Sequence, residues 1–374
     1  MTEQEILYTM ALTRLPRLNQ QMLRLLMGQM GNATAIYEHR ADIRDVLPEA
    51  TENLTESLMQ MDGQLKRAEE ELAFAQSGHI QCICLNDEEY PLRLRDCPDA
   101  PILLYYRGTA DLNARHIVSV VGTRQITEYG KDMCRHFIHD LSQRCPDVLV
   151  ISGLAYGVDI HAHRASLENG LGTMGVLAHG LDQIYPAHHR ATAVKMLAQG
   201  GLLTEFMSRT FPDKRYFVQR NRIVAGISDA TIVVESASKG GSLITAEIAE
   251  SYHRDVYAFP GRIGDMYSEG CNELIRSNRA ALLTDAESFV QYMGWEDEAL
   301  RQKSLQDGIQ QPLFPDLNEE EQRIVQVLQQ CDSMQINVLS VKTGLSIGLL
   351  SSTLFTLEMK GVVKMLNGGM YRLL

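Results

Sequence analysis

The sequence of 374 residues lacks the features that mark a membrane protein or a secreted one. No apolar run approaches the roughly 18 to 20 residues that span a bilayer, and the amino-terminus has no basic segment followed by an apolar one. The seven cysteines are odd in number and scattered through a long chain, which argues against a disulfide framework. We therefore expect a cytoplasmic protein with reduced thiols and no contact with membranes.

Motifs for metals, cofactors and nucleophiles are also missing. Cys82 and Cys84 would make half a metal site or two core side chains on one strand, and no second close pair follows. His161 and His163 lie two positions apart on an expected helix and point to different faces, and His188-His189 are adjacent. No serine stands in a G-x-S-x-G elbow. We expect no metal, no cofactor and no enzymatic activity.

The length and the apolar patterns divide the chain into several parts. Helical spacing without strand signals predicts an all-α domain at 1–75, and a proline-rich run predicts an extended connecting segment at 76–113. Residues 114–293 alternate apolar strand-like runs with helical patterns, which predicts a doubly wound parallel sheet of the Rossmann type. The expected strands are 117–121, 148–152, 173–178, 202–206, 231–234, 256–259 and 281–284.

The remainder predicts a linker and a small carboxyl-terminal domain. Residues 294–317 hold two prolines and little periodicity, which is typical of a linker. In 318–374, Asn318 and Glu321 have the spacing of a capping box, and three helices followed by a hairpin indicate a winged helix.

Charge is distributed unevenly along the chain. The net charge is −12, yet residues 114–290 carry 18 basic and 19 acidic side chains, so the acid lies at the two ends. Between Arg209 and Arg222, five basic residues face the single acid Asp213. This stretch also holds Phe211, Tyr216 and Phe217. Cations beside aromatic rings suit a polyanion with flat bases, although these aromatics could equally be core residues.

Three glycine-containing loops follow expected strands and meet at one sheet edge. They contain Gly122 and Arg124, then Ser152, Gly153 and Gly157, then Lys239, Gly240, Gly241 and Ser242. Glycines at a helix start expose backbone N–H groups to an anion, and Arg124 and Lys239 add positive charge. Arg124 could instead pair with a nearby acid. We expect Arg220, Asn221 and Arg222 to lie at the start of a helix and to face the same edge. The G-x-G-x-x-G pattern of dinucleotide-binding enzymes is missing, so we do not expect an NAD or FAD enzyme.

These motifs, taken together and in order, resemble the family of DNA-processing protein A, DprA, also called Smf. The matching runs are Val120–Arg124, Ser152–His163, Phe211–Pro212 with Arg220–Ser228, Gly240–Ala246, and Phe259–Gly261 with Ser268–Ile275. The resemblance implies an extended Rossmann domain that binds single-stranded DNA, a sterile-alpha-motif-like amino-terminal domain and a winged helix. It further implies a homodimer that protects single-stranded DNA and helps load the RecA recombinase in DNA uptake, transformation and recombination. In that family the arginine and lysine at the positions of Arg124 and Lys239 contact DNA.

The chain departs from the family pattern at three places. His179 stands where a small residue is usual, and Gly240-Gly-Ser242 replaces the usual Ser-Gly-Ser. The third helix of the winged helix, Ile347 to Met359, has no Lys or Arg and one acid, Glu358, whereas a helix that reads duplex DNA presents basic or amide side chains. We therefore expect this domain to contact protein.

The sequence leaves a main hypothesis and two alternatives. The main hypothesis is a non-catalytic, sequence-independent binder of single-stranded DNA. The first alternative is a nucleotide-processing enzyme of the phosphoribohydrolase type, since Thr245 and Glu247 approach its Thr-x-x-Glu pattern with one residue fewer between them. The second is a purely structural adaptor, which would bind no polyanion.

Overall fold

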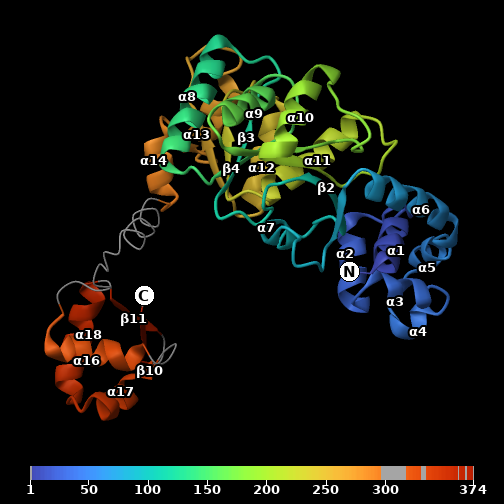
Figure 1. Ribbon diagram of the computed structural model, residues 1–374. Helices are drawn as coiled ribbons and strands as arrows, with labels where there is room; N and C mark the ends of the chain where they lie inside the picture. Colours follow the sequence, from blue (N-terminus) through green and yellow to red (C-terminus); the bar gives the residue numbers. More distant parts are fainter. Residues whose placement is uncertain (1, 296–316, 330–333, 361, 367–368, 374) are drawn as a thin grey trace. The chain divides into compact units, whose positions relative to one another are not determined.

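The computed structural model separates the chain into two units, Met1–Glu296 and Asp297–Leu374. The residues it describes are 2–295, 317–329, 334–360, 362–366 and 369–373 (Figure 1). The predicted linker, 294–317, lies almost entirely outside them. No single helix in the described part is long and apolar enough to cross a membrane. The two helices α17 (Ile336–Thr343) and α18 (Ile347–Met359) meet the length and composition criteria only as a pair bent by 106°.

Six helices form the amino-terminal part of the first unit, drawn in blue in Figure 1. They are α1 (Glu3–Thr13), α2 (Gln20–Met30), α3 (Ala33–Glu38), α4 (Ile43–Val46), α5 (Glu52–Leu58) and α6 (Asp62–Ser77). Thr2, Asn19, Asn32 and Thr51 each cap a helix by accepting a hydrogen bond from its first turn. The helices predicted from the spacing are thus confirmed, and they belong to the same unit as the sheet that follows.

A nine-stranded sheet follows, in the order β1-β2-β6-β5-β4-β3-β7-β8-β9. Its strands are β1 (Gln81–Cys84), β2 (Leu103–Gly108), β3 (Ile117–Val121), β4 (Leu149–Ser152), β5 (Gly172–Val176), β6 (Gly200–Thr204), β7 (Ala230–Val233), β8 (Asp255–Ala258) and β9 (Ala281–Leu282). The strands from β3 to β9 are mutually parallel, and their side chains are buried on both faces in the centre of the sheet. The predicted doubly wound parallel sheet is confirmed.

Helices cover both faces of the sheet. They are α7 (Leu92–Arg95), α8 (Glu128–Arg144), α9 (Val158–Glu168), the 3-10 turn η1 (Ala187–His189), α10 (Arg190–Gln199), α11 (Lys214–Gly226), α12 (Gly241–Ser251), α13 (Glu269–Arg276) and α14 (Ala286–Tyr292). Helix α8 packs against α9 and α14, while α11 packs against α12. The chain crosses from β6 on one side of β3 to β7 on the other, so the strand order reverses at β3.

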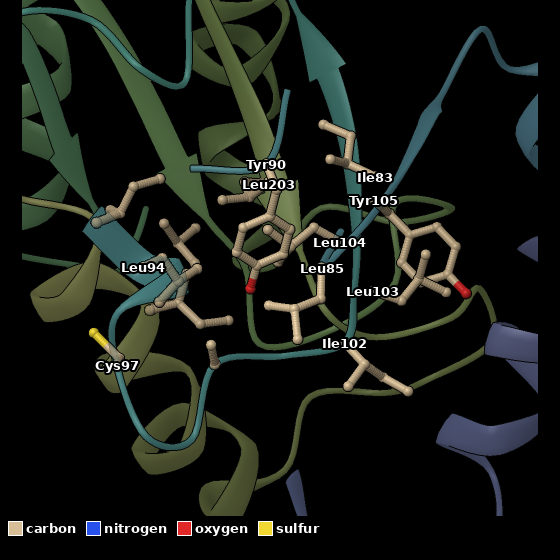
Figure 2. Packing of buried hydrophobic residues seen from close by; sticks show 14 of the residues in the cluster. Ile83, Leu85, Tyr90, Leu94, Cys97, Ile102, Leu103, Leu104, Tyr105 and Leu203 are labelled. Carbon is tan, nitrogen blue, oxygen red and sulfur yellow. The ribbon is translucent and has the colours of Figure 1, made fainter. Parts of the chain in front are cut away.

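The segment 76–113 does more than connect two domains. It supplies β1 and β2, which pair antiparallel with each other at the edge of the sheet, and β2 also pairs antiparallel with β6. Its side chains fill a core that is continuous with the amino-terminal helices, as the packing around the fully buried Tyr90 shows (Figure 2). The Tyr90 hydroxyl donates to the carbonyl of Pro101 at 2.7 Å. Cys84 packs in the same core, and the described residues contain no group of three His, Cys, Asp or Glu that could hold a metal.

The second unit contains α16 (Glu319–Leu328), β10 (Met334–Gln335), α17 (Ile336–Thr343), α18 (Ile347–Met359), β11 (Val363–Leu366) and β12 (Met370–Leu373). The capping box is present, since the Asn318 side chain and Glu321 each accept from the other's backbone N–H. Strand β12 pairs with both β10 and β11. The predicted winged helix is confirmed, and two residues of its predicted Asn-Gly-Gly turn, 367–368, lie outside the described residues.

His163 on α9 is a buried histidine whose protonation should oppose folding. Its Nδ1 lies 2.7 Å from the Thr173 hydroxyl, which itself donates to the carbonyl of Val150. Nδ1 therefore carries the hydrogen, and Nε2 is buried with no hydrogen-bond partner among the described residues. Burial lowers the pKa of His163 from 6.5 to about 3.

We expect His163 to make the first unit sensitive to acid. Below pH 6.5 His163 becomes protonated in the unfolded chain but stays neutral in the folded chain. The free energy of unfolding should therefore fall by about 2 kcal/mol between pH 7 and pH 5. The single tryptophan, Trp295, is buried in the core that α8 and α14 share, so its fluorescence in urea titrations reports this unit. His163→Gln should lose most of this pH dependence. An unchanged dependence in His163→Gln would show that another group causes it.

Candidate functional site

A pocket of about 880 Å³ opens at the carboxyl ends of the central strands. Loops that follow β3, β4, β5 and β7 line it, together with one face of α11. The reversal of strand order at β3 separates neighbouring loops at this edge and leaves a crevice there. The structure brings ten of the predicted residues together in its lining: Gly122, Arg124, Gly153, Phe217, Arg220, Asn221, Lys239, Gly240, Gly241 and Ser242.

The amino-terminus of α12 lies at this pocket, because Gly240, Gly241 and Ser242 line it. Gly240 is its N-cap, and no side chain accepts a hydrogen bond from the first turn. The Ser242 hydroxyl donates instead to Ser236 at 2.9 Å, and a Cβ on Gly240 would lie 2.3 Å from that serine's oxygen. The positive end of the helix dipole is therefore open to an anion, with the exposed Lys239 ammonium beside it.

Arg124, after β3, lies over an aromatic ring and has no acidic partner. Its guanidinium carbon lies 5.1 Å from the centre of the Phe217 ring. Among the described residues it makes no salt bridge, so the alternative of a surface arginine paired with an acid does not hold. An exposed arginine whose donors are unused, held at a pocket wall by an aromatic ring, suits a phosphate.

Arg220 builds the floor of the pocket. Its guanidinium is buried, donates to the carbonyl of Gly153 at 2.8 Å and also to that of Val176. Burial lowers its pKa to about 10, so it is charged at neutral pH. Asp159 is buried nearby, and this burial raises its pKa while the charge of Arg220 opposes the rise. A Cβ on Gly153 would lie 2.4 Å from the Arg220 guanidinium, so a side chain there would displace that group.

The loop after β4 is arranged differently from the prediction. The Asp159 carboxylate accepts from the N–H groups of Gly153 and Ala155, at 3.1 and 3.3 Å, so these donors are not free for a ligand. Ser152 and Gly157 do not line the pocket. The Ser152 hydroxyl donates to the carbonyl of Val120, and Gly157 adopts φ of 78° with no room for a Cβ, which would lie 2.0 Å from the carbonyl oxygen of Thr123. Both residues fix the loops that form the pocket wall.

Arg222 faces away from the pocket. The expectation that Arg220 to Arg222 begin a helix is wrong, because α11 begins at Lys214. Two positions along a helix turn a side chain by about 200°, so Arg220 and Arg222 point to opposite faces. Arg222 donates to the Glu205 carboxylate at 2.5 Å and to the carbonyl of Asp99 at 2.5 Å. This buried pair replaces the phosphate contact that the sequence suggested for Arg222.

The three aromatic side chains of the basic stretch have different surroundings. Phe217 lies half-buried between Arg124 and Arg220 at the pocket wall. Tyr216 packs its ring against Phe206, with the two centres 4.7 Å apart. Phe211 is 72% exposed and has no ring contact among the described residues. Phe211 is thus the most exposed of the three, although it does not line the pocket.

Sequence reasoning missed two parts of the pocket wall. Lys214 lines it as a third cation, and its membership of the basic stretch was the available signal. Gln183, Ile184 and Tyr185 line it from the loop after β5. In that loop the Tyr185 N–H donates to Nε2 of His179, so the unusual His179 positions this wall. Only the place of the loop at the carboxyl end of a central strand indicated a role.

Both units match models of known protein families. The model for DNA recombination-mediator protein A matches residues 81–294, and that for the DprA winged helix domain matches residues 310–369. A putative DNA processing protein DprA of Mycobacterium tuberculosis is 32% identical over 318 residues, which cover 82% of this chain and 80% of the relative. A DNA processing protein DprA of Streptococcus pneumoniae is 38% identical over 204 residues, 54% of this chain and 71% of the relative.

Solved structures give the same result. The X-ray structure of DNA processing protein A from Streptococcus pneumoniae has a TM-score of 0.65 and 31% identity, covering 78% of this chain and 98% of that chain. DNA processing protein A from Helicobacter pylori, described for its unique mode of binding single-stranded DNA, has a TM-score of 0.52 and 27% identity. It covers 57% of this chain and 95% of that chain.

Proposed function

We propose that the chain binds single-stranded DNA without sequence preference in this pocket. It belongs to the DprA/Smf family of DNA recombination-mediator proteins. The observation that carries the proposal is that the exposed cations Arg124, Lys214 and Lys239 line the same pocket as the open amino-terminus of α12. Cations and helix N–H groups bind phosphates, which every nucleotide carries, so they give affinity independent of sequence.

The other site residues have supporting roles in this proposal. Gly240, Gly241 and Ser242 present N–H groups, and Gly122 and Asn221 border the phosphate path. Arg220 holds the loop after β4 through Gly153, which keeps the pocket floor in place. Phe211 is the aromatic residue best placed by exposure to stack on a base, a contact worth roughly 1 to 3 kcal/mol.

The family relationship supports a wider role. We propose that the chain protects single-stranded DNA, forms a homodimer and helps load RecA during recombination and DNA uptake in the cytoplasm. We further propose that it is not an enzyme. In the phosphoribohydrolase alternative a glutamate takes part in the chemistry. Thr245 lines the pocket, but Glu247 is exposed and does not line it.

A titration of labelled single-stranded DNA at two salt concentrations tests the binding proposal. We expect tighter binding of single strand than of duplex, and a log–log salt slope of about −0.7 for each phosphate neutralised, or roughly −2 for three cations. Chromatography of the same samples should detect no free base or nucleotide product. A slope near zero, equal affinity for duplex, or released base would contradict the proposal.

A further inference from the structure

A second surface with cations and an exposed aromatic ring adjoins the pocket. We name it the α9–α10 ridge and define it by Tyr156, Arg164, His188 and Arg190. Ala155 and Ala187 line the pocket, and Tyr156 and His188 are the next residues in the chain. The ridge therefore begins at the pocket rim on two separate loops.

Contacts through His189 hold the two halves of the ridge together. The Tyr156 ring meets the His189 ring edge to face, with centres 5.0 Å apart, and Nδ1 of His189 lies 2.8 Å from the carbonyl of Leu154. Helices α9 and α10 also pack against each other. Tyr156 remains 45% exposed, so its ring is presented to solvent on a fixed support.

The ridge carries positive charge that the protein does not neutralise. Arg164 and Arg190 are exposed, and among the described residues neither makes a salt bridge. Burial first, and then the charges of Lys131 and Arg164, lower the pKa of the neighbouring His161. Of the acids near the ridge, Glu128 pairs with Lys131 at 2.6 Å and Asp159 is bonded within its own loop. Glu168, one helical turn after Arg164 on α9, makes no salt bridge among the described residues.

We infer that single-stranded DNA leaving the pocket continues over the α9–α10 ridge, with phosphates on Arg164 and Arg190 and a base stacked on Tyr156. The inference rests on the proposed function and extends it, because it assigns a second binding segment and gives the path of the DNA strand beyond the pocket. Exposed arginines next to an aromatic ring are the chemistry that single-strand binding surfaces use. A phosphate strand recognised in this way needs no particular sequence.

Oligothymidylates of two lengths test the inference on the full chain. Single-strand modules cover roughly 4 to 16 nucleotides, so a strand of about 4 would fill the pocket alone and one of about 16 would also reach the ridge. Arg164→Ala/Arg190→Ala should bind the longer strand about 5- to 20-fold more weakly and flatten its salt slope by about 1.4. It should change binding of the shorter strand less than about twofold, because the pocket is intact. Tyr156→Ala should weaken only the longer strand, with the slope unchanged.

The control variants separate the ridge from the pocket. Arg107→Ala removes one positive charge from an exposed arginine on β2 that lines no part of the pocket and makes no salt bridge among the described residues, and it should change neither affinity. If Arg124→Ala weakens both strands while the ridge variants bind the longer strand like wild type, the ridge inference is wrong and the pocket stands. An equal loss for both lengths in the ridge variants would also overturn it, since the ridge would then act through the shape of the pocket. If Arg124→Ala binds both strands normally, the proposed pocket itself fails.

Discussion

Replacing Arg124 and Lys239 together by alanine is expected to weaken binding of single-stranded DNA by about two to four orders of magnitude. Hydrogen bonds to charged groups contribute about 1.5 to 3 kcal/mol each, and every 1.4 kcal/mol is a factor of ten in affinity. Both side chains are exposed at the pocket wall and make no salt bridge among the described residues, so no internal ion pair is lost with them. The loss should therefore appear in binding and leave folding intact.

The salt dependence identifies the mechanism of this loss. With two fewer phosphates neutralised, the slope of log affinity against log salt concentration should be flatter by about 1.4, measured by fluorescence anisotropy between roughly 50 and 200 mM salt. The matched control is Arg276→Ala/Arg279→Ala, which removes two positive charges that pair with Glu273 and Glu250 outside the pocket. Weaker binding with an unchanged slope would mean that the two cations shape the loops and do not hold phosphates. Unchanged binding would place the DNA elsewhere.

The sequence was sufficient to predict the fold where burial leaves a continuous apolar run. The parallel strands β3 to β7 are such runs, because helices cover both faces of the sheet, whereas both residues of the edge strand β9 are exposed. The antiparallel strands β1 and β2 were not predicted, since they are short and lie in a proline-rich segment, and β2 pairs with β6 about a hundred residues further on. Pairing over that separation leaves no local pattern in the sequence.

The site was predictable where the residue type alone determines the chemistry. Arg124, Lys239 and the Gly240–Ser242 turn follow strand ends, and parallel strand ends meet at one edge. The direction of a side chain on a helix depends on where the helix begins, which the sequence did not reveal for α11. For this reason Arg220 and Arg222 were grouped together, although one faces the pocket and the other a buried carboxylate.

Replacing Arg222 by methionine is expected to lower the free energy of unfolding by about 3 to 5 kcal/mol at neutral pH, because it leaves a buried carboxylate without its cation. The side chains of Arg222 and Glu205 are 8% and 2% exposed, and their salt bridge is 2.5 Å long. Gln20 of α2 also donates to Glu205, at 3.2 Å, so the pair lies where the amino-terminal helices meet the sheet. Trp295 fluorescence in urea titrations reports the loss, since Trp295 and Arg222 belong to the same unit.

Acidity and a second substitution separate this explanation from a simple packing defect. Burial already raises the pKa of Glu205, and removing Arg222 should raise it further. Protonation would then neutralise the carboxyl at moderately acid pH, so the deficit should shrink as the pH falls; a packing defect would not depend on pH. Arg222→Met/Glu205→Met should recover most of the loss, while Arg215→Met, on an exposed part of the same helix, should change little.

Folded Arg222→Met should bind single-stranded DNA within about twofold of wild type. A variant of normal stability that fails to bind would show that Arg222 contacts the strand after all.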